Sequence, residues 1–110
     1  MKMPSIAKQY EIYLPILYND GTEIETGKFD TIEQELVEQF GGVTAMQRQF
    51  PLKGMWKGER QTYLDKIVVF TVVDFRGSVG QDFFTHYKEE LKQRFQQEEI
   101  LITAHDLTVI

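Results

Sequence analysis

The stretch Ile-Val-Val-Phe-Thr-Val-Val at residues 67–73 is the strongest strand-forming segment of the chain, because it holds only β-branched and aromatic residues. Both of its alternating faces are apolar, which is typical of a strand inside a sheet. Residues 10–17 and 99–105 alternate in the same period, and the less hydrophobic residues 43–48 favour an edge strand. The sequence therefore predicts four strands, with the one at residues 64–73 in the interior.

Two amphipathic helices separate these strands. The first spans about residues 27–40, with apolar side chains at positions 29, 32, 36, 37 and 40 on one face. Thr26 is its expected N-cap, and the glycines at 41 and 42 are expected to end it. The second runs to about Gln97, and Ser78 to Gln81 predicts a capping box at its start. Residues 50–61 are the least regular stretch, and they are expected to form a long hairpin connection with a short strand of its own around Met55 and Trp56.

The order strand, helix, strand, strand, helix, strand is that of a ferredoxin-like βαββαβ sandwich, an α+β fold. It predicts a four-stranded antiparallel sheet with two helices on one face, in a single domain at residues 10–110 behind a loose N-terminal segment at residues 1–9. A shift of 55 residues superposes Leu36 and Phe40 on Leu91 and Phe95, and Ile12 on Ile67. This indicates an internal duplication, unless two amphipathic helices resemble each other by chance.

Composition excludes several function classes. The chain has 110 residues with 12 basic and 17 acidic side chains, and this net charge of -5 argues against nucleic-acid binding. It has no cysteine, so thiol chemistry and thiolate metal sites are absent. No apolar run approaches the roughly 20 residues of a membrane helix, and the first residues lack the apolar region of a signal peptide. We expect a cytoplasmic protein with no membrane partner.

No motif for catalysis or cofactor binding is present. The two histidines, His86 and His105, meet no known metal-ligand spacing, so we expect no metal and no cofactor. There is no nucleophile elbow and no phosphate-binding glycine motif. The apolar segment at residues 64–70 also lacks the basic and aromatic pattern of an RNA-recognition motif.

The face of the sheet away from the helices is not clearly polar on any central strand. An apolar face of that size is unusual on a monomer, so something is expected to cover it. A second copy of the chain is our first hypothesis, because closed two-fold assembly is the commonest kind. The alternatives are the segment at residues 50–60 folded back over the sheet, or an apolar ligand.

Six residues are candidates for ligand binding or for the interface. Trp56 lies between glycines and lysines, where a tryptophan serves as an interface anchor, a ligand lid or a plug of the core. Near the end of the second helix, Glu98 is expected to pair with Arg94 at the i, i+4 spacing, or alternatively to turn inward as a buried acid. The full set is Trp56, Arg60, Tyr63, Arg94, Gln97 and Glu98.

Three motifs resemble a group of small bacterial proteins of unknown function. They are F-G-G-V-T at residues 40–44, G-M-W-K-G at residues 54–58 and L-K-Q-R-F-Q-Q-E-E-I-L at residues 91–101. The resemblance implies a ferredoxin-like fold and implies no activity. The positions that match the pattern of the group are Gly42, Thr44, Trp56, Arg94, Phe95, Gln97 and Glu98.

These observations leave three functions open. The first is a homo-oligomeric module, a homodimer through the open sheet face, that binds a small molecule or has a regulatory role without catalysis. The second is a cofactor-independent small enzyme with a dimeric α+β barrel that encloses an apolar substrate. The third is a purely structural interaction protein.

Overall fold

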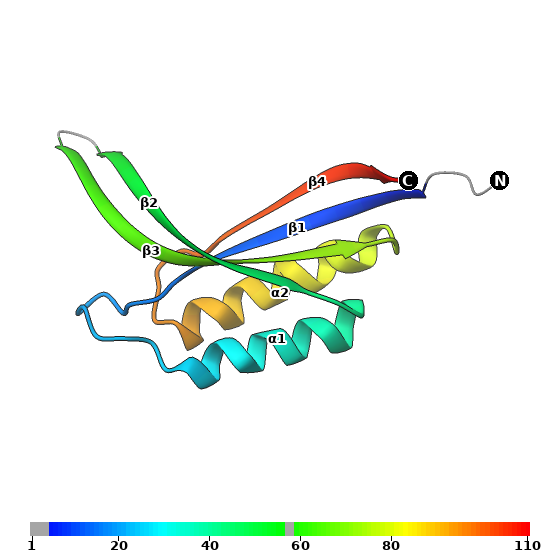
Figure 1. Ribbon diagram of the computed structural model, residues 1–110, viewed down its shortest axis with the longest axis horizontal. Helices are drawn as coiled ribbons and strands as arrows, with labels where there is room; N and C mark the ends of the chain where they lie inside the picture. The colour runs from blue at the N-terminus through cyan, green and yellow to red at the C-terminus, as the bar shows by residue number, and fades with distance from the viewer. Residues whose placement is uncertain (1–4, 57–58) are drawn as a thin grey trace.

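A computed structural model describes residues 5–56 and 59–110, and the side chains of residues 5–45 and 67–110. Figure 1 shows both helices side by side along one face of the sheet. The expected α+β class with a ferredoxin-like arrangement is confirmed. The elements in chain order are β1 (Ser5–Pro15), α1 (Thr26–Phe40), β2 (Thr44–Trp56), β3 (Glu59–Asp74), α2 (Ser78–Arg94) and β4 (Leu101–Val109).

The four strands follow the order β2-β3-β1-β4, and each neighbouring pair is antiparallel. The apolar stretch at residues 67–73 lies on the interior strand β3, and β2 lies at an edge, as the sequence predicts. Ile12 on β1 pairs with Phe70 on β3 and with Ile102 on β4. Directly paired residues point to the same side, so these three side chains share the face that the helices cover.

The core lies between this face and the helices. Tyr10, Ile12 and Leu14 point into it from alternate positions of β1. The ring centroid of Phe84 lies 4.5 Å from that of Tyr10 and 5.3 Å from that of Phe40, so aromatic contacts join both helices to the sheet. The helices and the segment that follows α2 add further fully buried side chains, Ile32, Leu36, Leu91, Phe95 and Ile100.

The helix ends agree with the sequence at one terminus and differ at three. Gly41 ends α1 in the left-handed conformation, with φ of 82°, and its N–H donates to the carbonyl of Val37 at 2.7 Å. The N-cap of α1 is Glu25 rather than Thr26, and no side-chain hydrogen bond caps it. Helix α2 ends at Arg94, three residues before the predicted end.

The capping box predicted at Ser78 is wrong, because Ser78 is the first helical residue of α2 and Gly77 is the N-cap. Gly77 has φ of 70°, in the left-handed region that glycine favours. The carboxylate that accepts a backbone N–H beside this helix start belongs to Asp74, whose Oδ1 lies 3.1 Å from the nitrogen of Arg76. This hydrogen bond closes a turn before the helix, and no side-chain hydrogen bond caps α2.

Two further expectations fail at strand ends. β1 begins at Ser5, so residues 5–9 of the expected loose segment belong to the sheet. Residues 50–56 and 59–61 are more regular than expected, because they belong to the paired antiparallel strands β2, which continues to Trp56, and β3, which begins at Glu59. β1 reaches β3 only as far as the pair of Pro15 with Ile67. Residues 49–56 and 59–66 therefore form a two-stranded arm that pairs only with itself.

The arm changes the shape of the molecule. Figure 1 shows it bending away from the helix layer. The radius of gyration is 15.7 Å, whereas a compact domain of this length has about 13 Å. Two strands alone are marginally stable in water, so the arm is expected to need a further contact.

The 55-residue shift fits the helices but not the strands. Leu36 and Leu91 are both fully buried at equivalent places between the helices and the sheet. Ile12 points toward the helices, whereas Ile67 alternates with the core residues Val68 and Phe70 and lies on the opposite face. Ile12 lies opposite Phe70 rather than Ile67, so the duplication does not extend to the strands.

Candidate functional site

A polar cluster lies at the middle of the open sheet face, which is the face away from the helices. Gln9, Glu11 and Tyr13 alternate with the core residues of β1 and therefore point to this face. The Gln9 amide donates to Glu11 Oε1 at 3.3 Å, and the Tyr13 hydroxyl donates to Glu11 Oε2 at 3.0 Å. Each oxygen of the carboxylate thus accepts one hydrogen bond, which fixes its orientation. We call these three residues the open-face cluster.

Threonines flank the cluster on both neighbouring strands. Glu11 pairs with Thr71 on β3 and with Thr103 on β4, so both threonines point to the open face beside the carboxylate. Their hydroxyl groups can donate or accept hydrogen bonds. The centre of this face can therefore bind a polar group of a ligand.

Apolar side chains border the open-face cluster. Val69, which pairs with Tyr13, is only 3% exposed, and Ile67 is half-buried. Leu101, which pairs with Tyr13 from the other side, is 57% exposed. Val73 and Leu107 extend the apolar border at the opposite end of the same strands. The described open face is therefore mixed, and the expected apolar face is present only in part. Its apolar side chains border a polar centre of Gln9, Glu11, Thr71, Thr103 and His105, which the sequence interpretation did not single out.

Glu11 is a half-buried carboxylate without a counter-ion among the described side chains. The ion pairs formed by described residues involve other acids, and Glu11 takes part in none of them. It is also the only carboxylate on the open face of the described residues. A carboxylate held by two neutral donors keeps its negative charge available to an external cation.

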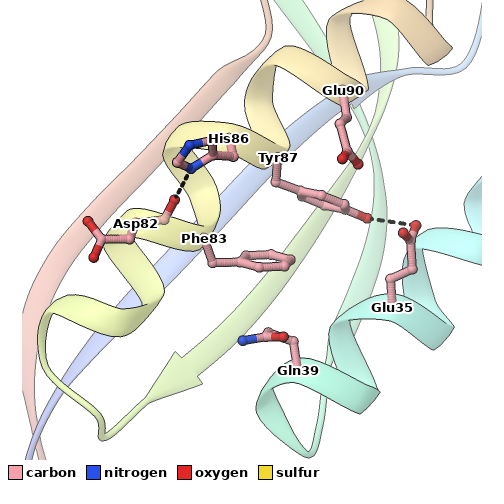
Figure 2. Close-up of a pocket in the computed structure, with 7 residues that line it drawn as sticks. All are labelled: Glu35, Gln39, Asp82, Phe83, His86, Tyr87 and Glu90. Atoms are coloured by element: carbon pink, nitrogen blue, oxygen red, sulfur yellow. Dashed lines mark hydrogen bonds between the residues drawn. The ribbon is translucent and has the colours of Figure 1, made fainter.

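A second polar cluster lies between the helices, on the outer surface. Figure 2 shows the groove, with the Phe83 ring between α1 and α2 and the Tyr87 hydroxyl pointing to Glu35. It encloses about 510 Å³, and its walls are acidic. The residues that line it are Glu35, Gln39, Asp82, Phe83, His86, Tyr87 and Glu90.

Two of the carboxylates that line this groove, Glu35 and Glu90, form ion pairs with Arg94 within the chain. Arg94 from α2 donates to both carboxylate oxygens of Glu35 on α1, with Nη2 to Oε2 at 2.9 Å, and also to Glu90 at 3.0 Å. The Arg94 guanidinium lowers the pKa of Glu35, although partial burial opposes this effect. Burial and the nearby Glu35 raise the pKa of Tyr87. We interpret this cluster, which we call the helix clamp, as a structural link between the two helices.

A third polar group is buried where β3 meets α2. Asp74 is 3% exposed, and its Oδ1 accepts from Nε of Arg76 at 2.8 Å. Its Oδ2 and the Tyr10 hydroxyl have no hydrogen-bond partner in the described part of the chain. Burial raises the pKa of Tyr10, and the Asp74 carboxylate adds to this effect. Both atoms lie close to the position that a Cβ atom at Gly80 would take, so this position requires a glycine.

The structure brings the predicted candidates to different places. Arg94 belongs to the helix clamp and pairs with Glu35 and Glu90. The expected pair of Arg94 with Glu98 is wrong, because α2 ends at Arg94 and Glu98 lies beyond the helix. Glu98 is exposed, so it is no buried acid. Gln97 donates from its amide to the carbonyl of Phe95 at 3.0 Å, a local contact that stabilises the end of the helix.

Three candidates have side chains outside the described residues. Trp56, Arg60 and Tyr63 lie on the arm, where the backbone pairs Trp56 with Glu59 and Tyr63 with Leu52. Their ligand or interface roles stay predictions. The sequence interpretation did not single out Glu11, and the available signal was a charged residue between Gln9 and Tyr13 on the second face of the first strand.

Metal and membrane features were searched over the described residues. No group of three or more His, Asp or Glu side chains that could hold a metal ion is found there. The same part of the chain contains no helix that is long and apolar enough to cross a membrane.

Comparison with solved structures identifies the fold. A phage SAM lyase in complex with S-methyl-5'-thioadenosine has a TM-score of 0.65 and 12% sequence identity, and the match covers 99% of this chain and 93% of the lyase. The same kind of enzyme in its apo state has a TM-score of 0.56 and 13% identity, with 99% and 94% covered. At this identity the likeness shows a shared compact α+β fold.

Comparison of the sequence itself finds less. No protein-family model and no curated protein matches the chain. The resemblance to small bacterial proteins and the cytoplasmic location therefore stay predictions.

Proposed function

We propose that this protein is a homo-oligomeric module that binds a small molecule at the open-face cluster, with a second copy of the chain covering the open sheet face. The observation that carries the proposal is a fixed polar centre, Gln9, Glu11 and Tyr13, within an apolar sheet face. Binding sites commonly combine apolar walls with a few placed polar groups. The absence of a described element over this face leaves room for a partner.

The second copy is supported by the exposed apolar side chains and by the arm. Leu101 is 57% exposed at the border of the cluster, and apolar surface of this kind is commonly covered in an assembly. The arm pairs only with itself, so a contact with another copy would give it the support that two strands lack. An isologous interface through the open face would meet both requirements.

The proposal is tested by measuring binding and mass together. We expect the protein to bind S-adenosylmethionine, the sulfonium compound on which the structural neighbours act by name, in isothermal titration calorimetry. Tyr13→Phe removes one hydrogen bond to Glu11 and is expected to weaken binding by about tenfold. The control is Tyr18→Phe, at a tyrosine that bonds to Glu25 and Lys28 away from the open face. Equal affinities for the two variants would contradict the site.

Light scattering after size exclusion tests the assembly. A particle larger than the 12.9 kDa chain is expected at micromolar concentration. A monomer at all concentrations would remove the second copy from the proposal.

A second candidate function is a cofactor-independent enzyme. The observation that favours it is the likeness to phage SAM lyase over nearly the whole chain. Glu11 is then the group placed to accept a proton, and the second copy encloses the substrate. Incubation with S-adenosylmethionine, followed by chromatography, tests this function. Release of S-methyl-5'-thioadenosine that Glu11→Gln abolishes would favour the enzyme, and intact S-adenosylmethionine would favour the binding module.

A further inference from the structure

The charge of Glu11 has a consequence for assembly. Glu11 lies near the middle of β1, an interior strand, and therefore near the middle of the open face. In an isologous interface each copy contributes the same patch, so two copies that pack through this face bring two Glu11 carboxylates toward each other. Each would lose water on assembly, and like charges that are brought together repel.

Nothing described in the chain offsets this charge. Gln9 and Tyr13 are neutral donors that orient the carboxylate, and Thr71 and Thr103 are neutral as well. His105, which pairs with Gln9, is the one basic side chain among the described residues of this face, and it forms no ion pair with Glu11. No described side chain forms an ion pair with Glu11, although Glu35 on the helix side pairs with Arg94. The described part of the open face therefore holds a carboxylate without an ion-pair partner in the chain.

We propose that assembly through the open face is linked to an organic cation, which binds at Glu11 and neutralises the carboxylates that the two copies bring together. The inference rests on the proposed function, because it requires the second copy at this face. It adds the chemical class of the ligand and makes assembly depend on that ligand.

The surroundings of Glu11 favour an organic cation over a metal ion. Calcium takes six to eight oxygen ligands, and magnesium requires near-octahedral geometry, whereas the described open face offers one carboxylate beside hydroxyl and amide groups. Leu101, which is 57% exposed, provides an apolar contact close to that charge. A sulfonium or alkylammonium group carries its charge within an apolar shell, so it matches a single carboxylate with apolar neighbours.

The test compares the dimer dissociation constants of the full chain, measured by sedimentation equilibrium, with and without cations. S-adenosylmethionine supplies a sulfonium, and choline supplies an ammonium. S-adenosylhomocysteine is the matched control for the sulfonium, because it keeps the amino-acid group of S-adenosylmethionine and lacks only the methyl group and the sulfonium charge. We expect at least one cation to tighten the wild-type dimer about tenfold or more, and S-adenosylhomocysteine to have little effect.

Glu11→Gln keeps the shape and removes the charge. We expect this variant to dimerise about tenfold more tightly than wild type without ligand, and to lose its response to cations. Glu38→Gln is the control, because Glu38 is exposed on α1 and changes the net charge by the same amount. It is expected to behave like wild type.

The outcomes separate the inference from the proposed function. A wild-type dimer that forms equally well with and without cations, together with the same affinity for Glu11→Gln, overturns the cation linkage and leaves the dimer standing. If wild type and Glu11→Gln both stay monomeric with every probe, both the second copy and the linkage fail. Tightening by S-adenosylmethionine alone assigns a sulfonium, and tightening by choline alone assigns an ammonium.

Discussion

The helix clamp and the open-face cluster are built from the same parts with one difference. Each holds a half-buried glutamate that accepts a hydrogen bond from a tyrosine, Glu35 from Tyr87 and Glu11 from Tyr13. In the helix clamp the other donor is the Arg94 guanidinium, and in the open-face cluster it is the neutral amide of Gln9. Glu35 in the helix clamp therefore has a counter-ion within the chain, whereas Glu11 in the open-face cluster has none among the described side chains.

This difference is the reason why we propose a structural role for the helix clamp and a ligand-binding role for the open-face cluster. A guanidinium that bridges two helices fixes their distance and has its charge satisfied. A carboxylate held only by neutral groups has a fixed direction and no internal counter-charge, so its best partner comes from outside. A groove of about 510 Å³ lies beside the helix clamp. The lack of an internal counter-ion for Glu11 nevertheless favours the open face as the place where a cation binds.

The largest expected effect concerns the packing on the helix side. A Cβ atom at Gly80 would lie 2.3 Å from Asp74 Oδ2 and 2.9 Å from the Tyr10 ring. Gly80→Ala is therefore expected to destabilise the protein by about 2–3 kcal/mol or more, because buried groups must move. The melting temperature should fall by roughly 10 °C or more.

The control for this prediction is Gly42→Ala. Gly42 is exposed, and an added Cβ would meet nothing within 4 Å. A change within about 0.5 kcal/mol is expected there. Equal melting temperatures for the two alanine variants would show that the buried groups on the helix side are not held in place.

The sequence predicts the layers of this fold better than the positions at which its helices and strands begin and end. The apolar run at residues 67–73 is long enough to mark an interior strand, and residues 29–40 show a helical period. The arm was missed because Pro51 and the glycines at 54 and 58 indicate a loop, whereas backbone pairing overrides these local preferences. A cap at Ser78 was predicted from four residues, but Ser78 is the first helical residue of α2. Asp74 at the end of the preceding strand accepts the N–H of Arg76 before the helix begins.

The candidate site was harder to predict, for a different reason. Arg94 and Glu98 have the spacing of a helical pair, but the position at which α2 ends decides which acid Arg94 reaches. Glu35 is 59 residues away in sequence, and only the packing of α1 on α2 brings it near. The charge of Glu11 was visible, but its lack of a counter-ion among the described residues depends on what every neighbouring strand offers.

Removing the guanidinium from the helix clamp is the next largest effect. Arg94→Gln leaves Glu35 partly buried without its cation, and we expect a loss of about 1–2 kcal/mol, between the values of exposed and buried pairs. Lys92→Gln is the control, because Lys92 pairs with the exposed Glu89 at 3.4 Å. Chemical denaturation measures both variants. A loss for Arg94→Gln no larger than that for Lys92→Gln would remove the structural role of the clamp.

The helix clamp also predicts a dependence of stability on pH. The pKa of Glu35 is lowered in the folded protein from its ordinary value of 4.5. The stabilisation is therefore fully present above about pH 4.5 and is lost as the pH falls through the lower pKa of the folded state. Glu35→Gln should abolish this part of the dependence, so its melting temperature should fall less than that of wild type below about pH 4.5. Parallel curves for the two proteins would contradict the prediction.

The smallest effect on stability is expected when the open-face cluster receives a guanidinium like that of the helix clamp. Gln9→Arg places a guanidinium beside Glu11 on the same face, and a partly exposed pair of this kind contributes only about 0.2–1 kcal/mol to folding. Its effect on assembly is expected to be larger, because the carboxylate then has a counter-ion within the chain. The variant should dimerise without any added cation, and choline or S-adenosylmethionine should no longer tighten the dimer in sedimentation equilibrium. If the Gln9→Arg variant still requires an added cation to dimerise, the missing counter-ion does not distinguish the two clusters. The shape of the open face, rather than its charge, would then limit dimerisation.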